Sequence, residues 1–505
     1  MLTIHDIAVW DTGERVDLII PQIDRGRLLA ESGAVVAGDI DGSSLIVAPG
    51  LADPHVHFRD PGQRDKETMV TGSQAAAAGG YTRVLIMPNT LPAADGRDVN
   101  IQDVVDDGNE LEEVGVVNTL DYLQRYEQLH NVKLPVRYDL SVCASLGRAG
   151  KLPTQPDDYV RFMDCAGQSS HSDNLETDAS EGSDDSNNPV LEHPLRAITD
   201  DGSAITGQIL DAVLADSKAT GLPVLEHCEH HDSGAINDGA VSRKLGIAGI
   251  PAETELAIVD RDIEATRRTG AHIHFQHVST AGAFDAVRKA KAEGLPITCE
   301  TAPHYLALCD EDILKYGAMA KMNPPLRSEA DRRATVAAIA DGTVDMIATD
   351  HAPHTAAEKA SGLADAPNGI IGLECAYGVC RKVLVEGGAI SDERLIELMS
   401  LEPERLMGHT PTDVAMLLNT SAKCATKRTL DLSKVEHPEN VDLTLIDTHN
   451  EWTVDSSKFH SKGRNTPFDG WKLTGRPMAT IIGSKLVFSR LSNGSGSKED
   501  SSRAV

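Results

Sequence analysis

Residues 45–59 read Leu-Ile-Val-Ala-Pro-Gly-Leu-Ala-Asp-Pro-His-Val-His-Phe-Arg, an apolar run that ends in two histidines and an arginine. Its aliphatic and β-branched content predicts a buried strand over residues 45–57. Side chains alternate along a strand, so His55 and His57 point to the same side, about 7 Å apart along the chain. The stretch therefore predicts a strand that presents two imidazoles at its carboxyl end.

Seven more β-rich runs follow, and alanine-rich helical runs separate them. The predicted strands cover residues 82–88, 136–143, 195–199, 223–228, 272–278, 297–301 and 344–349. Predicted helices lie between them, for example at residues 67–78, 207–220, 252–269 and 281–293. Eight strand–helix repeats predict an α/β fold of the (β/α)₈ TIM-barrel type.

The two ends of the chain have a different pattern, with short alternating segments broken by glycines. We expect residues 1–50 and 437–490 to form one small β-sandwich domain, with the barrel at residues 51–436 between them. Residues 164–192 are rich in Asp, Glu, Ser and Asn and hold no Lys or Arg, which predicts an acidic disordered insertion. Residues 491–505, rich in Ser and Gly, predict a flexible tail.

The charge and composition of the chain restrict the classes of molecule that it can bind. A formal net charge of −30 argues against nucleic acid and against anionic membranes, which would both repel the chain. The sequence has no apolar run of about eighteen residues that could span a bilayer. Its first residues lack the pattern of a secretory signal, and its eight cysteines form no CxxC pair. These features favour a cytoplasmic protein without disulfides.

Further polar residues recur where the predicted strands end. They are Asp200 and Asp201, His227, His277 and Asp350. The carboxyl ends of barrel strands meet over one mouth, so these groups are expected near His55 and His57. Burying so many polar groups without partners costs several kcal/mol, and a metal ion offsets that cost. Histidines with carboxylates favour Zn²⁺, one or two per subunit, and zinc supports hydrolysis by lowering the pKa of a bound water to about 7. Asp350 is the candidate for the proton transfers.

This order of motifs resembles the amidohydrolase superfamily, and residues 53–61 and 348–359 (ATDHAPHTAAEK) are similar to the two signatures of dihydroorotases. The resemblance implies metal ligation by His55, His57, His227, His277 and Asp350, with Asp350 also acting as the catalytic acid and base. Some relatives bridge two metals with a carboxylated lysine at the fourth strand, where this chain has no lysine. The motif Asp200-Asp201-Gly202 resembles bacterial dihydroorotases that use an aspartate instead. We assign the bridge to Asp201, and Asp200 remains the alternative, because a register shift of one residue would exchange the two.

The resemblance also implies a small anionic substrate, since N-carbamoyl-L-aspartate and dihydroorotate both carry carboxylates. Arg59 follows the two histidines and has a guanidinium fork that suits a carboxylate. In the family, the residues that match Arg59, Asn89 and His354 hold that carboxylate. The remaining substrate contacts are assigned to His57, Asn323, Asn368 and Gly369.

The implied activity is the reversible, zinc-dependent cyclisation of N-carbamoyl-L-aspartate to (S)-dihydroorotate and water, a step of pyrimidine biosynthesis. Two alternatives stay open: a hydantoinase or allantoinase type of cyclic amidohydrolase, and a non-catalytic relative that serves as a partner subunit. Self-association, and association with aspartate transcarbamoylase, are also left open by the sequence.

Overall fold

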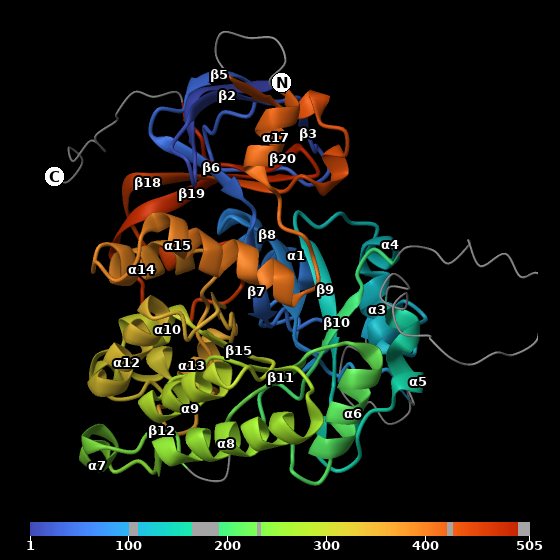
Figure 1. Ribbon diagram of the computed structural model, residues 1–505, viewed down its shortest axis with the longest axis vertical. Helices are drawn as coiled ribbons and strands as arrows, with labels where there is room; N and C mark the ends of the chain where they lie inside the picture. Colours follow the sequence, from blue (N-terminus) through green and yellow to red (C-terminus); the bar gives the residue numbers. More distant parts are fainter. Residues whose placement is uncertain (100–109, 164–190, 230–233, 422–427, 493–505) are drawn as a thin grey trace, which may run out of the picture.

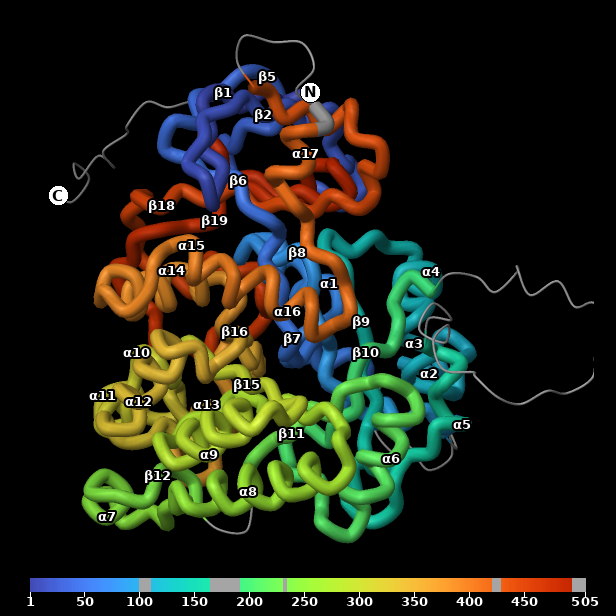
Figure 2. Tube along the Cα trace, viewed as in Figure 1, coloured from blue at the N-terminus to red at the C-terminus, as the bar shows by residue number. Residues whose placement is uncertain are grey.

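The computed structural model describes residues 1–99, 110–163, 191–229, 234–421 and 428–492. The molecule has two parts, a barrel and a sheet at one end of it (Figure 1). In Figure 2 the blue N-terminal segment and the orange-red C-terminal segment lie together in that sheet. The predicted acidic insertion and tail fall almost wholly outside the described residues.

Eight parallel strands form the barrel, in the order β16–β15–β14–β11–β10–β9–β8–β7. They are β7 (Leu51–Val56), β8 (Tyr81–Ile86), β9 (Arg137–Val142), β10 (Leu195–Ile198), β11 (Val224–Glu226), β14 (Ile273–Phe275), β15 (Ile297–Thr301) and β16 (Met346–Ile347). Each of them overlaps one of the predicted strands. The predicted (β/α)₈ fold is confirmed.

Side-chain and backbone contacts bring the first and last strands together. The carboxylate of Asp53, on β7, accepts hydrogen bonds from the Thr349 amide at 3.2 Å and from its hydroxyl at 2.5 Å. The amide of His57 donates to the carbonyl of His351 at 3.0 Å. These contacts place the carboxyl ends of β7 and β16 side by side, although residues 55 and 350 are far apart in the sequence.

Helices cover the outer face of the barrel (Figure 1), namely α1 (Met69–Ala78), α6 (Leu210–Thr220), α8 (Ala252–Thr269), α9 (Ala281–Ala292) and α12 (Glu329–Ala340). Local chemistry sets their ends: Gly270 adopts the left-handed conformation after α8, and the Thr280 hydroxyl caps α9 by accepting from the Ala283 amide. Within the described ranges, no helix is both long enough and apolar enough to cross a membrane.

A small apolar cluster fills the interior of the barrel: Ala52, Leu85, Met87, Ala197, Leu225 and Met407. Because these side chains occupy the middle, the residues predicted to bind metal lie above them, at the carboxyl ends of the strands. The barrel is therefore a packed core and not an open channel.

The terminal sheet has ten strands from both ends of the chain. Its main path is β17 (Thr429–Asp431), β2 (Arg15–Ile20), β1 (Leu2–Val9), β6 (Leu45–Pro49), β18 (Leu443–Thr453), β19 (Lys472–Ile482), β20 (Lys485–Ser489) and β3 (Gln22–Ile23). Beside this path, β4 (Leu29–Ala30) pairs with β20 and β5 (Gly38–Asp41) pairs with β1. Strand β17 joins this sheet from within residues 51–436, the range expected to form the barrel.

The single strand expected at residues 45–57 is divided in the structure. Its first half is β6 in the terminal sheet, and its second half is β7 in the barrel. Gly50 lies between them, where an added Cβ would come within 2.0 Å of the Thr82 hydroxyl. Pro49 lacks an amide hydrogen for a continuing ladder. The crossing from one sheet to the other therefore occurs at Pro49-Gly50.

Candidate metal centre at the barrel mouth

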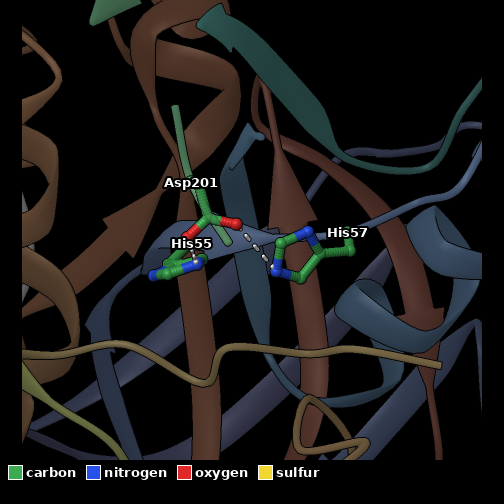
Figure 3. Close-up of side chains that lie close together, drawn as sticks. All are labelled: His55, His57 and Asp201. Atoms are coloured by element: carbon green, nitrogen blue, oxygen red, sulfur yellow. Dashed lines mark ion pairs between the residues drawn. The ribbon is translucent and has the colours of Figure 1, made fainter. Parts of the chain in front are cut away.

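The six residues that the sequence analysis selected as metal ligands come together at the carboxyl ends of the barrel strands, and none is more than 5% exposed. Their ligand atoms form three overlapping groups, each with all atoms within 4.8 Å of one another: His55, His57 and Asp201; His55, His277 and Asp350; and Asp201, His227 and His277. The first of these groups is drawn in Figure 3. Groups that share members in this way could hold two adjacent ions.

Asp201 faces both imidazoles of β7 (Figure 3). One of its carboxylate oxygens, Oδ1, lies 3.1 Å from Nε2 of His55, and the other, Oδ2, lies 3.5 Å from Nε2 of His57. Asp350 approaches the same two rings, with Oδ1 at 3.0 Å from Nε2 of His57 and 3.5 Å from Nε2 of His55. Asp201 also belongs to the group with His227 and His277, so its carboxylate lies within reach of both histidine pairs, as a bridging ligand would.

The two aspartates at the end of β10 point to different sides. Asp200 accepts hydrogen bonds from the amide of Ser145 at 2.9 Å and from the hydroxyl of the same residue, in the loop after β9. Asp201 points to the imidazoles instead. This geometry favours Asp201 over the alternative Asp200.

The charges of the site suit metal ligation. Burial by itself would raise the pKa of Asp201, but the imidazoles of His55 and His57 outweigh it and hold that pKa well below its ordinary value. The pKa of Asp350 is lowered in the same way, by His55 and His57 against the effect of burial. Burial lowers the pKa of His277. These shifts favour ionised carboxylates and a neutral His277, the forms that bind metal. Against the effect of burial, Asp201 and Asp350 raise the pKa of His55, so a metal ion there would displace a proton.

The residues present fit a metal ion. Four imidazoles and two carboxylates are donors that zinc and related divalent metals accept. Nδ1 of His277 is buried, and it has no hydrogen-bond partner among the described residues. A bound cation would satisfy that nitrogen, whose burial is otherwise unfavourable.

Three residues of the mouth have left-handed backbone conformations. The φ angles are 59° for Arg59, 33° for His277 and 47° for Asp350. This region disfavours residues with a Cβ and costs roughly 1–3 kcal/mol per residue. Such strain at three residues around one site indicates that side-chain placement there is maintained against local preference.

Glu300 is a functional residue that the sequence analysis missed. Its carboxylate accepts a hydrogen bond from Nδ1 of His55 at 2.9 Å and faces Nε2 of His274 at 3.1 Å. Burial would raise the pKa of Glu300, but His274 and His55 lower it to about 2. The ionised carboxylate keeps the proton of His55 on Nδ1 and leaves Nε2 for the metal. An acidic residue at the end of a buried strand was the available signal.

Asn89 contacts the metal-site residues directly. Its side-chain oxygen accepts from Nδ1 of His57 at 2.9 Å, and its side-chain nitrogen donates to Oδ2 of Asp201 at 3.2 Å. The family resemblance implies a role for Asn89 in holding the substrate carboxylate alone. In the structure it also orients two of the candidate ligands.

The other residues assigned to the substrate surround the same mouth. Nε of Arg59 is buried without a hydrogen-bond partner among the described residues, and so are both side-chain polar atoms of Asn323. Burial and then the charge of Arg59 lower the pKa of His354 to about 3. Nε2 of His354 donates to the carbonyl of Asn368 at 2.8 Å, which ties it to the loop that contains Gly369.

Two further residues support the mouth from unexpected places. A guanidinium nitrogen of Arg148, in the loop after β9, donates to the backbone carbonyl of Asp201. Asn465 lies between β18 and β19, yet its side-chain amide donates to the carbonyls of Ala352 at 2.9 Å and Gly369 at 3.0 Å. Neither residue belongs to a motif, so the sequence alone carried no signal for them.

Comparison with known proteins places this geometry in a family. A family model described as "Dihydro-orotase-like" matches residues 44–124. The chain is 34% identical over 458 residues to a dihydroorotase of Geobacillus thermodenitrificans, covering 89% of each chain. It is 37% identical over 498 residues to a dihydroorotase of Anaeromyxobacter dehalogenans, covering 96% of this chain and 98% of the relative.

Solved structures show the same fold at lower identity. An L-hydantoinase from Arthrobacter aurescens is similar with a TM-score of 0.64 at 21% identity, over 98% of this chain and 96% of the other. A D-hydantoinase from a Thermus species is similar with a TM-score of 0.64 at 18% identity and the same coverage. At these identities the likeness supports the fold and not the substrate.

Proposed function

The chain belongs to the dihydroorotase family of cyclic amide hydrolases, and we propose that it interconverts N-carbamoyl-L-aspartate and (S)-dihydroorotate with zinc as its metal. The observation that carries this proposal is the convergence of His55, His57, Asp201, His227, His277 and Asp350 in three overlapping groups. The role in pyrimidine biosynthesis follows from that reaction.

The six converging residues would hold the metal, with Asp201 between two positions. When bound, zinc supplies a water of lowered pKa and polarises the carbonyl under attack. In the hydrolytic direction, Asp350 accepts the proton of the attacking water and passes it to the departing ring nitrogen. In the synthetic direction the same carboxylate accepts the proton of the carbamoyl nitrogen and returns it to the leaving water.

Orientation of the substrate is assigned to the groups around the metal centre. Arg59 and His354 are proposed to hold the substrate carboxylate. Both side-chain polar atoms of Asn323 lack a hydrogen-bond partner among the described residues, so they are available to the substrate. Holding the reacting groups in line removes translational and rotational freedom before the reaction, which contributes several kcal/mol to the rate.

A substrate comparison tests the proposal. The purified, zinc-loaded protein is assayed with dihydroorotate, hydantoin and allantoin under identical conditions. We expect turnover of dihydroorotate to exceed that of the other two by at least about 10²-fold, because only dihydroorotate offers a carboxylate to Arg59. Preferential turnover of hydantoin or allantoin would reject the substrate assignment and favour the hydantoinase alternative.

Metal analysis separates an enzyme from a non-catalytic partner subunit. We expect at least one equivalent of zinc per chain together with turnover, since all six candidate ligands are present. A protein that binds no zinc and does not turn over dihydroorotate would be a non-catalytic relative.

Sedimentation of the pure protein, alone and with an aspartate transcarbamoylase, tests the separate proposals of self-association and of that partnership.

A further inference from the structure

Two buried lysines hold the loop that carries Asn368 and Gly369. Lys359 ends α13 (Ala356–Lys359), is 4% exposed, and donates from Nζ to the carbonyl of Pro367 at 2.9 Å. Lys321 is 5% exposed and donates from Nζ to the carbonyl of Ala364 at 2.7 Å. The carbonyl of Lys321 accepts in turn from the Gly369 amide at 3.0 Å. The two residues therefore fix residues 364–369 at three points.

The use of charged side chains for this task is unusual. Lysine is rarely buried this far without a carboxylate partner. Glu358, the carboxylate that acts on Lys359, is paired with Nζ of Lys66 at 2.8 Å instead. Burial, followed by repulsion from Lys321, lowers the pKa of Lys359 to about 7. Each of these buried amines therefore has a loop carbonyl as its hydrogen-bond partner.

The loop leads directly to the residues assigned to the substrate. The carbonyl of Asn368 accepts from Nε2 of His354 at 2.8 Å. Gly369 has a φ of 150°, and an added Cβ there would lie 2.6 Å from the carbonyl oxygen of Ala352 and 2.7 Å from the His354 ring. Because the backbone passes this tightly, a displacement of the loop must also displace His354.

We propose that Lys359 and Lys321 are positioning residues that fix the backbone of residues 367–369, the loop that carries the substrate contacts assigned to Asn368 and Gly369. This inference rests on the proposed function. The lysines act through the loop and through His354, so their loss should weaken substrate binding more than it slows the chemical step.

The test compares Lys359→Met with Lys359→Arg and with Lys244→Met, a matched control at an exposed lysine of α7 (Ala240–Leu245). All are zinc-loaded full-length proteins assayed with dihydroorotate. Lys359→Met should raise KM about tenfold or more and change kcat less than about threefold, because the lost contact acts equally on bound substrate and transition state. Lys359→Arg, which keeps a donor and a charge, should recover most of the affinity, and Lys244→Met should match the wild type.

A double variant adds a readout that a merely structural role would not produce. Lys321→Met should raise KM in a similar way, and the combined variant should raise it by less than the product of the two single effects, because both act on one loop. Should Lys359→Met fail to fold, Lys321→Met and Lys359→Arg still report on KM.

Two outcomes would overturn the inference. A KM within twofold of the wild type for both single variants, with only a lowered Tm, would reduce the lysines to a structural role. Fully independent effects in the double variant would remove the shared loop as the cause. Absence of dihydroorotate turnover by the wild type would instead reject the proposed function and this inference with it, whereas normal wild-type turnover with unaltered variants rejects the inference alone.

Discussion

Two clusters of buried charged side chains lie at opposite ends of the barrel, and they differ in how their charges are paired. At the end next to the terminal sheet, Arg83 lies 3.3 Å from Asp139 and 3.2 Å from Glu404. Asp139 also accepts from Nε2 of His409 at 2.7 Å. At the mouth, imidazoles crowd against two carboxylates, and Nδ1 of His277 has no hydrogen-bond partner within the described part of the chain.

The two clusters differ in the pairing of their charges and not in burial. Asp139 and Asp201 are both at most 2% exposed. The pKa of Asp139 is lowered, against the effect of burial, by Arg83 within its own cluster. Asp201 depends on imidazoles that a metal would otherwise engage. The cluster next to the terminal sheet pairs its arginine with carboxylates, whereas the mouth gathers metal-binding groups that a cation and a substrate would engage.

The largest expected effect is the loss of turnover when Asp350, at the barrel mouth, is replaced. Asp350→Asn keeps the size of the side chain but removes the group that carries the proton. We expect kcat to fall by about 10²–10⁴-fold, the usual contribution of general acid–base catalysis. Zinc bound per chain, measured on the same samples by mass spectrometry, should stay at half the wild-type value or more. Near-normal turnover would refute the assignment.

The next effect separates the two neighbouring aspartates. Asp201→Ala should lower the zinc bound per chain and reduce turnover at least about tenfold, since it removes a ligand that belongs to two of the groups. Asp200→Ala should retain the zinc, because its partner is Ser145. Equilibrium dialysis against zinc measures both variants. Loss of metal in Asp200→Ala with retention in Asp201→Ala would reverse the assignment.

A smaller effect is expected from the substrate side of the mouth. Arg59→Met should raise KM for dihydroorotate by about 10- to 100-fold, since a hydrogen bond to a charged group contributes about 1.5–3 kcal/mol. Zinc content should not change. Arg59→Lys keeps the charge but loses the planar fork of the guanidinium. Its KM should lie between those of the wild type and Arg59→Met. Initial-rate kinetics provide the measurement, and an unchanged KM in Arg59→Met would exclude a direct carboxylate contact.

The smallest effect concerns the cluster next to the terminal sheet and the pH dependence of the free energy of unfolding. Burial raises the pKa of Glu404 to about 7, from its ordinary value of 4.5, although Arg83 opposes this. The folded chain therefore binds an extra proton between these two values, and the free energy of unfolding falls as the pH rises through that range. Glu404→Gln should remove about 1–3 kcal/mol of this fall, leaving kcat unaltered. Urea unfolding at pH 5 and pH 8 measures it, and an identical pH dependence in both proteins would contradict the account.

Sequence patterns predicted the barrel because strand and helix periodicities are local. The same patterns missed the division of residues 45–57, because Gly50 packs closely against Thr82 of a neighbouring strand, a contact that a local pattern does not contain. The six converging residues could be predicted because each lies at the end of a predicted strand, and barrel topology brings such ends together. Arg148 and Asn465 reach the mouth from loops, where no periodicity limits the direction of a side chain. Glu300 was within reach of the same strand-end reasoning that selected Asp350.

The central claim is that the six converging side chains form a zinc site. An anomalous difference map at the zinc absorption edge, from crystals of the zinc-loaded protein, tests it most directly. The account predicts one or two peaks bounded by His55, His57, Asp201, His227, His277 and Asp350. An absence of peaks there, or a peak only at another group such as Glu127, Glu192 and His193, would contradict it.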